Sequence, residues 1–247
     1  MQEMKTSFDP LMVGLSYLLS VFGAYVALQL IRRIPAGNGK THFGWLSAAA
    51  LALGGGAIWA MHFIGMVAFD MGMPVQYDPV LTFLSMLLAV VATGFGLWFL
   101  SRGDASLGKI VVGGSFTGLG VAGMHYLGMK AMQMPAEVHY DSTIVAISVV
   151  IALVAATAAF WIAFHLQGSW QRFAAAFVMG AAVCGMHYTG MAAMSMMPND
   201  SASAFDSNSL TSQDLAFYVF LVTIGMLAIL FFAVMRPRMI ERTIPEG

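Results

Sequence analysis

Long apolar stretches, separated by short polar connections, set the pattern of the whole chain. A helix needs about 20 mostly apolar residues to cross a bilayer, and seven stretches meet that length. Apolar and polar residues do not alternate within them, which favours membrane-spanning helices over the strands of a β-barrel. The predicted spans cover residues 11–31, 45–67, 80–100, 110–129, 143–165, 173–194 and 215–235.

Composition narrows the class of protein further. Apolar residues make up 59% of the 247 residues and charged residues only 9%, whereas about 25% of a soluble domain is charged. A net charge of −1 leaves no basic footprint for a nucleic-acid partner. Cys184 is the only cysteine in the sequence, so an internal disulfide is excluded. We therefore expect an all-α membrane protein whose seven transmembrane helices lie in the lipid bilayer.

The basic residues predict which side of the membrane each loop faces, because Lys and Arg concentrate in cytoplasmic loops. With the N-terminus outside, nine of the 11 basic residues fall on the inner side, and only Lys5 and Lys130 fall outside. The predicted inner residues are Arg32, Arg33, Lys40, Arg102, Lys109, Arg172, Arg236, Arg238 and Arg242. We therefore expect the N-terminus outside and the C-terminus in the cytoplasm.

A six-residue motif occurs three times at a nearly constant spacing. Its copies read MHFIGM at 61–66, MHYLGM at 124–129 and MHYTGM at 186–191, so successive histidines lie 63 and 62 residues apart. A glycine precedes each histidine by seven residues, and a methionine follows it by nine. Such self-similarity indicates a repeat architecture. One period holds two spans, which predicts parallel repeats about a pseudo-threefold axis along the membrane normal.

The repeat divides the chain into three two-helix units and one further helix. We predict a single membrane domain over 1–247, with units at roughly 10–75, 80–136 and 143–198 and a seventh helix at 215–235. All three motifs then lie at the outer ends of the second, fourth and sixth helices. These helices are rich in glycine, which permits close approach of membrane helices. We therefore expect them at the centre of the bundle.

Each copy of the motif places an imidazole and a thioether on one helix face, because residues i and i+4 lie on the same side of a helix. The pairs are His62 with Met66, His125 with Met129, and His187 with Met191. Imidazole and thioether ligands together favour copper, and thioether favours Cu(I). No carboxylate shares these faces in the sequence, which argues against a di-iron bundle.

Packing is the competing explanation for these residues. Methionine fills irregular gaps in apolar cores, and most of the 21 methionines must serve packing. One membrane histidine could be a hydrogen-bonded helix contact, but ionisable residues within spans are rare and functional by default. Three equivalent histidines favour a metal site, either one crowded site or two smaller ones. The glycines at i+3, Gly65, Gly128 and Gly190, serve either close packing or room for a ligand.

The three motif copies, their spacing and the seven spans resemble the MHYT family of bacterial membrane sensors; the third copy contains the sequence MHYT itself. The resemblance covers nearly the whole chain. It implies a module of the bacterial cytoplasmic membrane that binds copper near the outer face. Through copper, the module would sense oxygen, carbon monoxide or nitric oxide and signal to a cytoplasmic partner.

Carried over to this sequence, the resemblance widens the set of site residues. It adds Met61, Met124 and Met186 to the candidate metal ligands. It adds Tyr126, Tyr188 and Thr189 as candidates that orient neighbours or bind the ligand. The first copy departs from the family pattern, because Phe63 stands in place of the tyrosine.

Three functions are compatible with a copper site in such a bundle. The first is a sensory module, in which the state of the copper changes the bundle and a partner reads the change. The second is a copper chaperone, store or transporter, favoured by further methionines near the outer face, namely Met71, Met73, Met132, Met134, Met194, Met196 and Met197. The third is a copper or haem oxidoreductase, which the lack of a general-base constellation disfavours. We expect a sensor without enzymatic activity.

Overall fold

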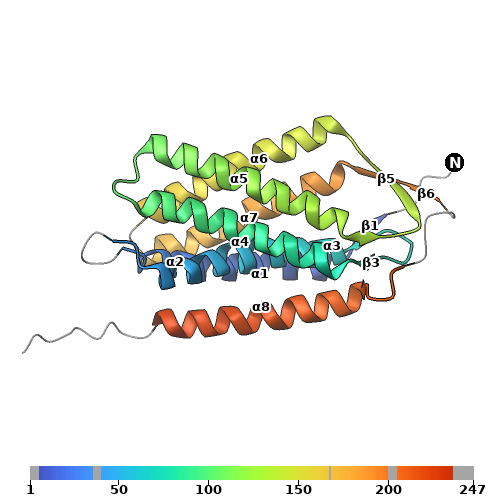
Figure 1. Ribbon diagram of the computed structural model, residues 1–247, viewed down its shortest axis with the longest axis horizontal. Helices are drawn as coiled ribbons and strands as arrows, with labels where there is room; N and C mark the ends of the chain where they lie inside the picture. The colour runs from blue at the N-terminus through green and yellow to red at the C-terminus, as the bar shows by residue number, and fades with distance from the viewer. Residues whose placement is uncertain (1–5, 36–39, 167, 200–204, 236–247) are drawn as a thin grey trace, which may run out of the picture.

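A computed structural model describes residues 6–35, 40–166, 168–199 and 205–235. The described residues form 7 helices long and apolar enough to cross a membrane, which confirms the predicted class of an all-α membrane protein. Figure 1 shows these helices side by side along the long axis, with short strands gathered at one end. Their bounds are Pro10–Ile31 (α1), Phe43–Val67 (the second span), Pro79–Ser101 (α4), Leu107–Lys130 (α5), Ser142–His165 (α6), Ser169–Ala192 (α7) and Ser212–Met235 (α8).

Aspartates begin the first helix of each pair in the same way. Asp9, Asp78 and Asp141 precede α1, α4 and α6, and their carboxylates accept main-chain N–H groups at 2.7–2.8 Å. This satisfies N–H groups that a helix start leaves free. Their own main-chain N–H groups donate to carbonyl oxygens at the end of the second helix of each pair. These bonds are Asp9 to Ala68 (2.8 Å), Asp78 to Ala131 (2.8 Å) and Asp141 to Ala193 (2.9 Å).

The second span consists of three helical segments in direct succession. They are α2 (Phe43–Ala50), the π-helix η1 (Leu51–Trp59) and α3 (Ala60–Val67). A π-helix is rare and often marks a functional site. Its three consecutive glycines face neighbouring helices, and two of them lie so close that a side chain would clash. A Cβ added at Gly54 would lie 2.6 Å from the carbonyl oxygen of Ala89, and one at Gly56 would lie 2.8 Å from a methyl group of Leu227.

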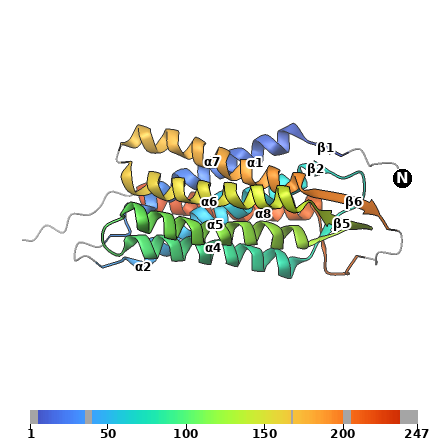
Figure 2. The same cartoon turned by 90° about the horizontal axis from the view of Figure 1, so that it is seen from above.

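The other helices pack around the second span. It contacts α1, α4 and α8, and 89% of its most apolar window is buried, against 17% for α6. From α4 the packing continues through α5, α6 and α7 back to α1, as Figure 2 shows from above. The expected central position therefore holds for the second span. It does not hold for α5 and α7, which bury 44% and 39% of their windows, against 50% for α1 and 39% for α4. The helix α8 packs on the second span and on α1.

Short antiparallel strands connect the helices at the end with the aspartate caps (Figure 1). The pairs are β1 (Ser7–Phe8) with β2 (Phe69–Asp70), β3 (Gln76–Tyr77) with β4 (Met132–Gln133) and β7 (Leu210–Thr211), and β5 (Ala136–Tyr140) with β6 (Met194–Pro198). The sequence predicted none of these strands, since they are too short to show alternation. The sixth span accordingly ends at Ala192 rather than 194, because Met194 pairs with Tyr140.

The fold does not test two predictions about the bundle. The orientation of the bundle in the membrane and its division into three units about one axis stay predictions. Lys5, Arg236, Arg238 and Arg242, four of the basic residues behind the predicted orientation, lie outside the described residues. The chain is a multi-pass membrane protein by the length and composition of its helices.

Candidate metal centre

Three histidines from three helices meet inside the bundle. His62 lies on α3, His125 on α5 and His187 on α7, and each is only 1% exposed. Their Nδ1 atoms form a triangle with sides of 3.0 Å (His62–His187), 3.1 Å (His62–His125) and 3.4 Å (His125–His187). Among the described residues, no Cys, Asp or Glu joins this cluster. The structure thus brings together the histidines of all three motif copies.

The triangle fits a metal ion better than it fits three uncharged rings alone. A neutral imidazole nitrogen carries either a proton or a lone pair. Three such atoms therefore cannot satisfy all three contacts by hydrogen bonds to one another. The point equidistant from the three nitrogens lies about 1.8 Å from each, which is close to the roughly 2.0 Å of an imidazole–metal bond. The three Nδ1 atoms together can hold one ion.

The opposite ring nitrogens point at the motif glycines in a cycle. An added Cβ would lie 2.2 Å from His62 Nε2 at Gly128, 2.2 Å from His125 Nε2 at Gly190, and 2.5 Å from His187 Nε2 at Gly65. Within the described part of the chain, none of these Nε2 atoms has a hydrogen-bond partner. Packing against glycine backbone therefore holds the rings in place. Of the two roles considered for these glycines, the structure supports close packing, because each glycine lies against the imidazole of another copy.

The methionines of the motif surround the triad. Met61, Met124 and Met186, which precede the histidines, line a void of about 10 Å³ together with the three rings. A void of this size holds at most one water molecule. The predicted ligands at i+4, Met66, Met129 and Met191, are also buried, at 0–2% exposure. That the sulfur atoms of these methionines bind the ion stays a prediction.

The two motif tyrosines point to serines on neighbouring helices. The Tyr126 hydroxyl lies 2.6 Å from Ser148 Oγ, and the Tyr188 hydroxyl lies 3.0 Å from Ser16 Oγ. Both serines donate their own protons to carbonyl oxygens of their helices, so the tyrosines are the donors in these pairs. Each tyrosine ring also meets its neighbouring histidine edge-on, with centroids 4.7–4.8 Å apart. The tyrosines therefore fix the histidine rings and tie the helices together.

The first copy replaces this contact with a different one. Phe63 is fully buried and offers no hydroxyl. Trp59 makes the corresponding contact with a serine, because its indole N–H donates to Ser85 Oγ at 3.1 Å. Ser85 in turn donates to the carbonyl oxygen of Thr82. The asymmetry at position 63 is thus compensated by a tryptophan one turn earlier in the same span.

The serines that receive these contacts were not among the residues predicted from the sequence. Ser16, Ser85 and Ser148 each follow an aspartate cap by seven residues, a signal that was present in the sequence. Thr189, the remaining candidate, donates its hydroxyl to the carbonyl oxygen of Gly185 on its own helix. The histidines outside the motif, His42, His139 and His165, are exposed.

Comparison with known families agrees with the repeat. The model of the MHYT family, described as "Bacterial signalling protein N terminal repeat", matches residues 55–113 and again residues 118–176. The two matches begin at Gly55 and Gly118, the glycines seven residues before His62 and His125. The family model therefore recognises the period that the motif defines.

Curated relatives are bacterial signalling proteins. The chain is 37% identical over 244 residues to the bifunctional diguanylate cyclase/cyclic di-GMP phosphodiesterase MucR of Pseudomonas aeruginosa, covering 96% of this chain and 35% of MucR. It is 34% identical over 197 residues to the cyclic di-GMP phosphodiesterase NbdA of the same bacterium, covering 76% of this chain and 24% of NbdA. It is 31% identical over 202 residues to the signaling protein YkoW of Bacillus subtilis, covering 77% of this chain and 24% of YkoW.

The chain spans about a third of the length of MucR and about a quarter of the lengths of NbdA and YkoW. No solved structure matches it. The two repeat matches, the three motif copies and these relatives all indicate the same family. The chain belongs to the MHYT family of bacterial signalling proteins.

Proposed function

We propose that this chain is a copper-binding sensory module of the bacterial cytoplasmic membrane. The Nδ1 triangle of His62, His125 and His187 carries this function, because three imidazoles from three helices face one another in a buried space. Imidazole suits copper and zinc alike, whereas the soft thioethers of the motif favour copper. When bound, copper would supply a redox-active centre at which oxygen, carbon monoxide or nitric oxide binds.

The surroundings of the triad are suited to passing a signal on. A histidine ring that shifts must press on a glycine of another helix, since no free space separates the two. The π-helix η1 joins α3 to the far end of the second span, and α8 packs on η1 where Gly56 meets Leu227. We place the triad near the outer face of the membrane and infer that α8 carries the change toward the cytoplasm.

The proposed partner is a cytoplasmic signalling domain or protein. MucR and NbdA are named for making or degrading cyclic di-GMP, and this chain matches 35% and 24% of their lengths. We infer that the module controls an output of that class. We assign the module no reaction of its own, since the residues that line the void at the triad are apolar apart from the histidines themselves.

Metal analysis of the detergent-purified protein tests the site. The wild type should carry close to one copper per chain, and a variant with His62, His125 and His187 all replaced by alanine should carry none. Each single alanine variant should bind copper far more weakly, because two imidazoles leave the ion without its third nitrogen ligand. His42→Ala is the matched control, since His42 is exposed and lies outside the cluster. Equal copper in all these variants would overturn the proposal.

Copper handling is the second candidate, and the methionines beyond the motif favour it. Met71 and Met134 are buried at 2% and 9% exposure, each nine residues after a motif histidine. Met194, Met196 and Met197 lie on the strand β6 next to the end of α7. A deletion strain distinguishes the two functions. Lost copper homeostasis with normal gas responses would favour a chaperone, store or transporter over a sensor.

A further inference from the structure

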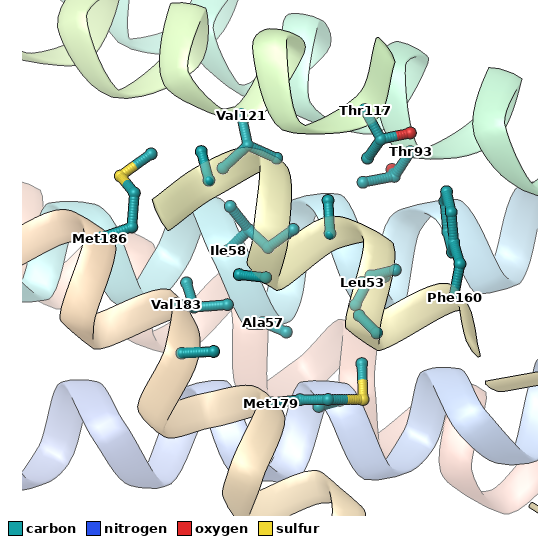
Figure 3. A pocket seen from close by; sticks show the side chains of 16 residues that line it. Leu53, Ala57, Ile58, Thr93, Thr117, Val121, Phe160, Met179, Val183 and Met186 are labelled. Atoms are coloured by element: carbon teal, nitrogen blue, oxygen red, sulfur yellow. The ribbon is translucent and has the colours of Figure 1, made fainter. Parts of the chain in front are cut away.

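A larger cavity lies deeper in the bundle than the void at the histidines. It holds about 50 Å³, and its lining comes from α1, η1, α4, α5, α6 and α7. Four lining residues, Ile58, Val121, Val183 and Met186, also line the void against the triad, so the two spaces are adjacent. Figure 3 shows Met186 at one end of this cavity and Phe160 at the other.

The cavity offers nothing that would hold water. Thr93 and Thr117 are its polar lining residues, and both hydroxyls already donate to main-chain carbonyl oxygens. Thr93 Oγ1 lies 2.8 Å from the oxygen of Ala89, and Thr117 Oγ1 lies 3.2 Å from that of Ala92. A buried water needs about two to four polar partners, and apolar cavities without them stay dry and accept apolar guests. The occupant must therefore be small, uncharged and apolar.

The cavity wall is thinnest where α6 and α7 line it. The lining residues from α1, η1, α4 and α5 are all buried. Its half-buried lining residues are Ala155, Ala156 and Ala159 on α6 and Ala182 and Val183 on α7. These half-buried residues, four alanines and one valine, form the part of the cavity wall that lies toward the outer surface of the bundle. Because apolar solutes favour hydrocarbon over water, such a guest arrives through the bilayer without passing the strands and polar loops.

We propose that this cavity binds one small apolar gas molecule, such as dioxygen, and delivers it from the bilayer to the histidine triad. The delivery step rests on the proposed sensory function, whereas occupation of the cavity does not require the metal. Dioxygen fits the observations because it is apolar, uncharged and small enough for a space of about 50 Å³. The shared lining residues put the bound molecule next to the rings.

Xenon is the probe for occupation, because it is an apolar atom that binds dry cavities without metal. Ala156→Leu and Ala182→Leu fill the cavity from α6 and from α7. Ala158→Leu is the matched control, because Ala158 lies on the exposed side of α6. Saturable xenon binding is measured by ¹²⁹Xe NMR on the purified full chain, and the position of the atom is read from crystals under xenon pressure.

The wild type and Ala158→Leu should bind xenon between α6 and α7 beside Val183, and both filling variants should lose it. Absence of saturable xenon in folded wild type, or equal binding in all four proteins, would overturn the proposal. Copper is measured on the same samples. Xenon binding without copper would contradict the proposed copper-dependent function but not the gas cavity. Copper without xenon binding would contradict the gas cavity alone.

The delivery route has its own readout. In copper-loaded protein, the association rate of carbon monoxide after flash photolysis should fall several-fold in Ala156→Leu and stay unchanged in Ala158→Leu. Both variants keep the three histidines, so their copper content should match the wild type. An unchanged association rate in Ala156→Leu and in Ala182→Leu would show that the gas reaches the triad by another path.

Discussion

Replacing Gly190 with alanine tests whether the motif glycines make room for the neighbouring imidazole. The new methyl group would lie 2.2 Å from His125 Nε2 and 2.8 Å from its Cδ2, whereas ordinary contacts begin at 3.4 Å. The ring must therefore retreat by about 1.2 Å, while metal–ligand distances tolerate only about 0.2 Å. Retreat pushes His125 Nδ1 toward two nitrogens that already lie 3.1 and 3.4 Å away. His125 can then no longer share the site.

Gly185→Ala is the control on the same helix, because a Cβ at Gly185 meets nothing within 4 Å. Alanine favours a helix over glycine by about 1 kcal/mol, so this control should be neutral or slightly stabilising. Overpacking at Gly190 should cost about 1–3 kcal/mol in the free energy of unfolding. Copper affinity, measured by titration against a competing chelator, should fall on the order of 10–100-fold. Wild-type affinity and thermal stability in Gly190→Ala would refute the reasoning.

Two further predictions concern Tyr188, which lies on the spanning helix α7, and Tyr77, which lies on the strand β3 outside the spans. Tyr188→Phe removes the donor to Ser16 and should lower the free energy of unfolding by about 0.5–1.5 kcal/mol while copper content stays constant; lost copper would mean that the hydroxyl serves the metal. Burial raises the pKa of Tyr77 on β3, against a smaller opposing effect of a hydrogen bond with Ser212. Since the unfolded chain then loses this proton more readily, stability should fall as pH rises beyond about 10. Unfolding followed at alkaline pH should show a shallower decline in Tyr77→Phe, and identical curves would contradict the assignment.

The apolar pattern determined the number of spans but not where each one ends. Hydropathy continues past Ala192 to Met194, yet the chain leaves the helix because Met194 pairs with Tyr140 on β5. Strand pairs of two to five residues depend on contacts between distant loops, and no local periodicity records them. The π-helix in the second span was equally invisible, since it arises where glycines let α4 and α8 approach the backbone.

The repeat made the candidate site visible, because it marked three histidines as equivalent. It could not determine which ring nitrogen faces the centre, since that depends on how the helices rotate against one another. Nor could the repeat distinguish residues that bind a ligand from residues that hold the site in place. The sequence left Tyr126 as a residue that either orients neighbours or binds the ligand, and in the structure its hydroxyl is directed to Ser148. The cavity next to the triad could not be predicted from the sequence either, because it forms between small side chains on separate helices.

The cyclic contact explains why one motif carries both a histidine and a glycine. Each copy contributes one imidazole to the triad and one glycine to the ring of another copy. The order is His62 on Gly128, His125 on Gly190 and His187 on Gly65. Losing any copy would therefore remove one imidazole of the triad and also the glycine against which a second imidazole packs. Since the three rings share one small buried space, a shift of one ring would act on α3, α5 and α7 together. Concerted movement of three helices is what a sensor inside a tightly packed bundle requires.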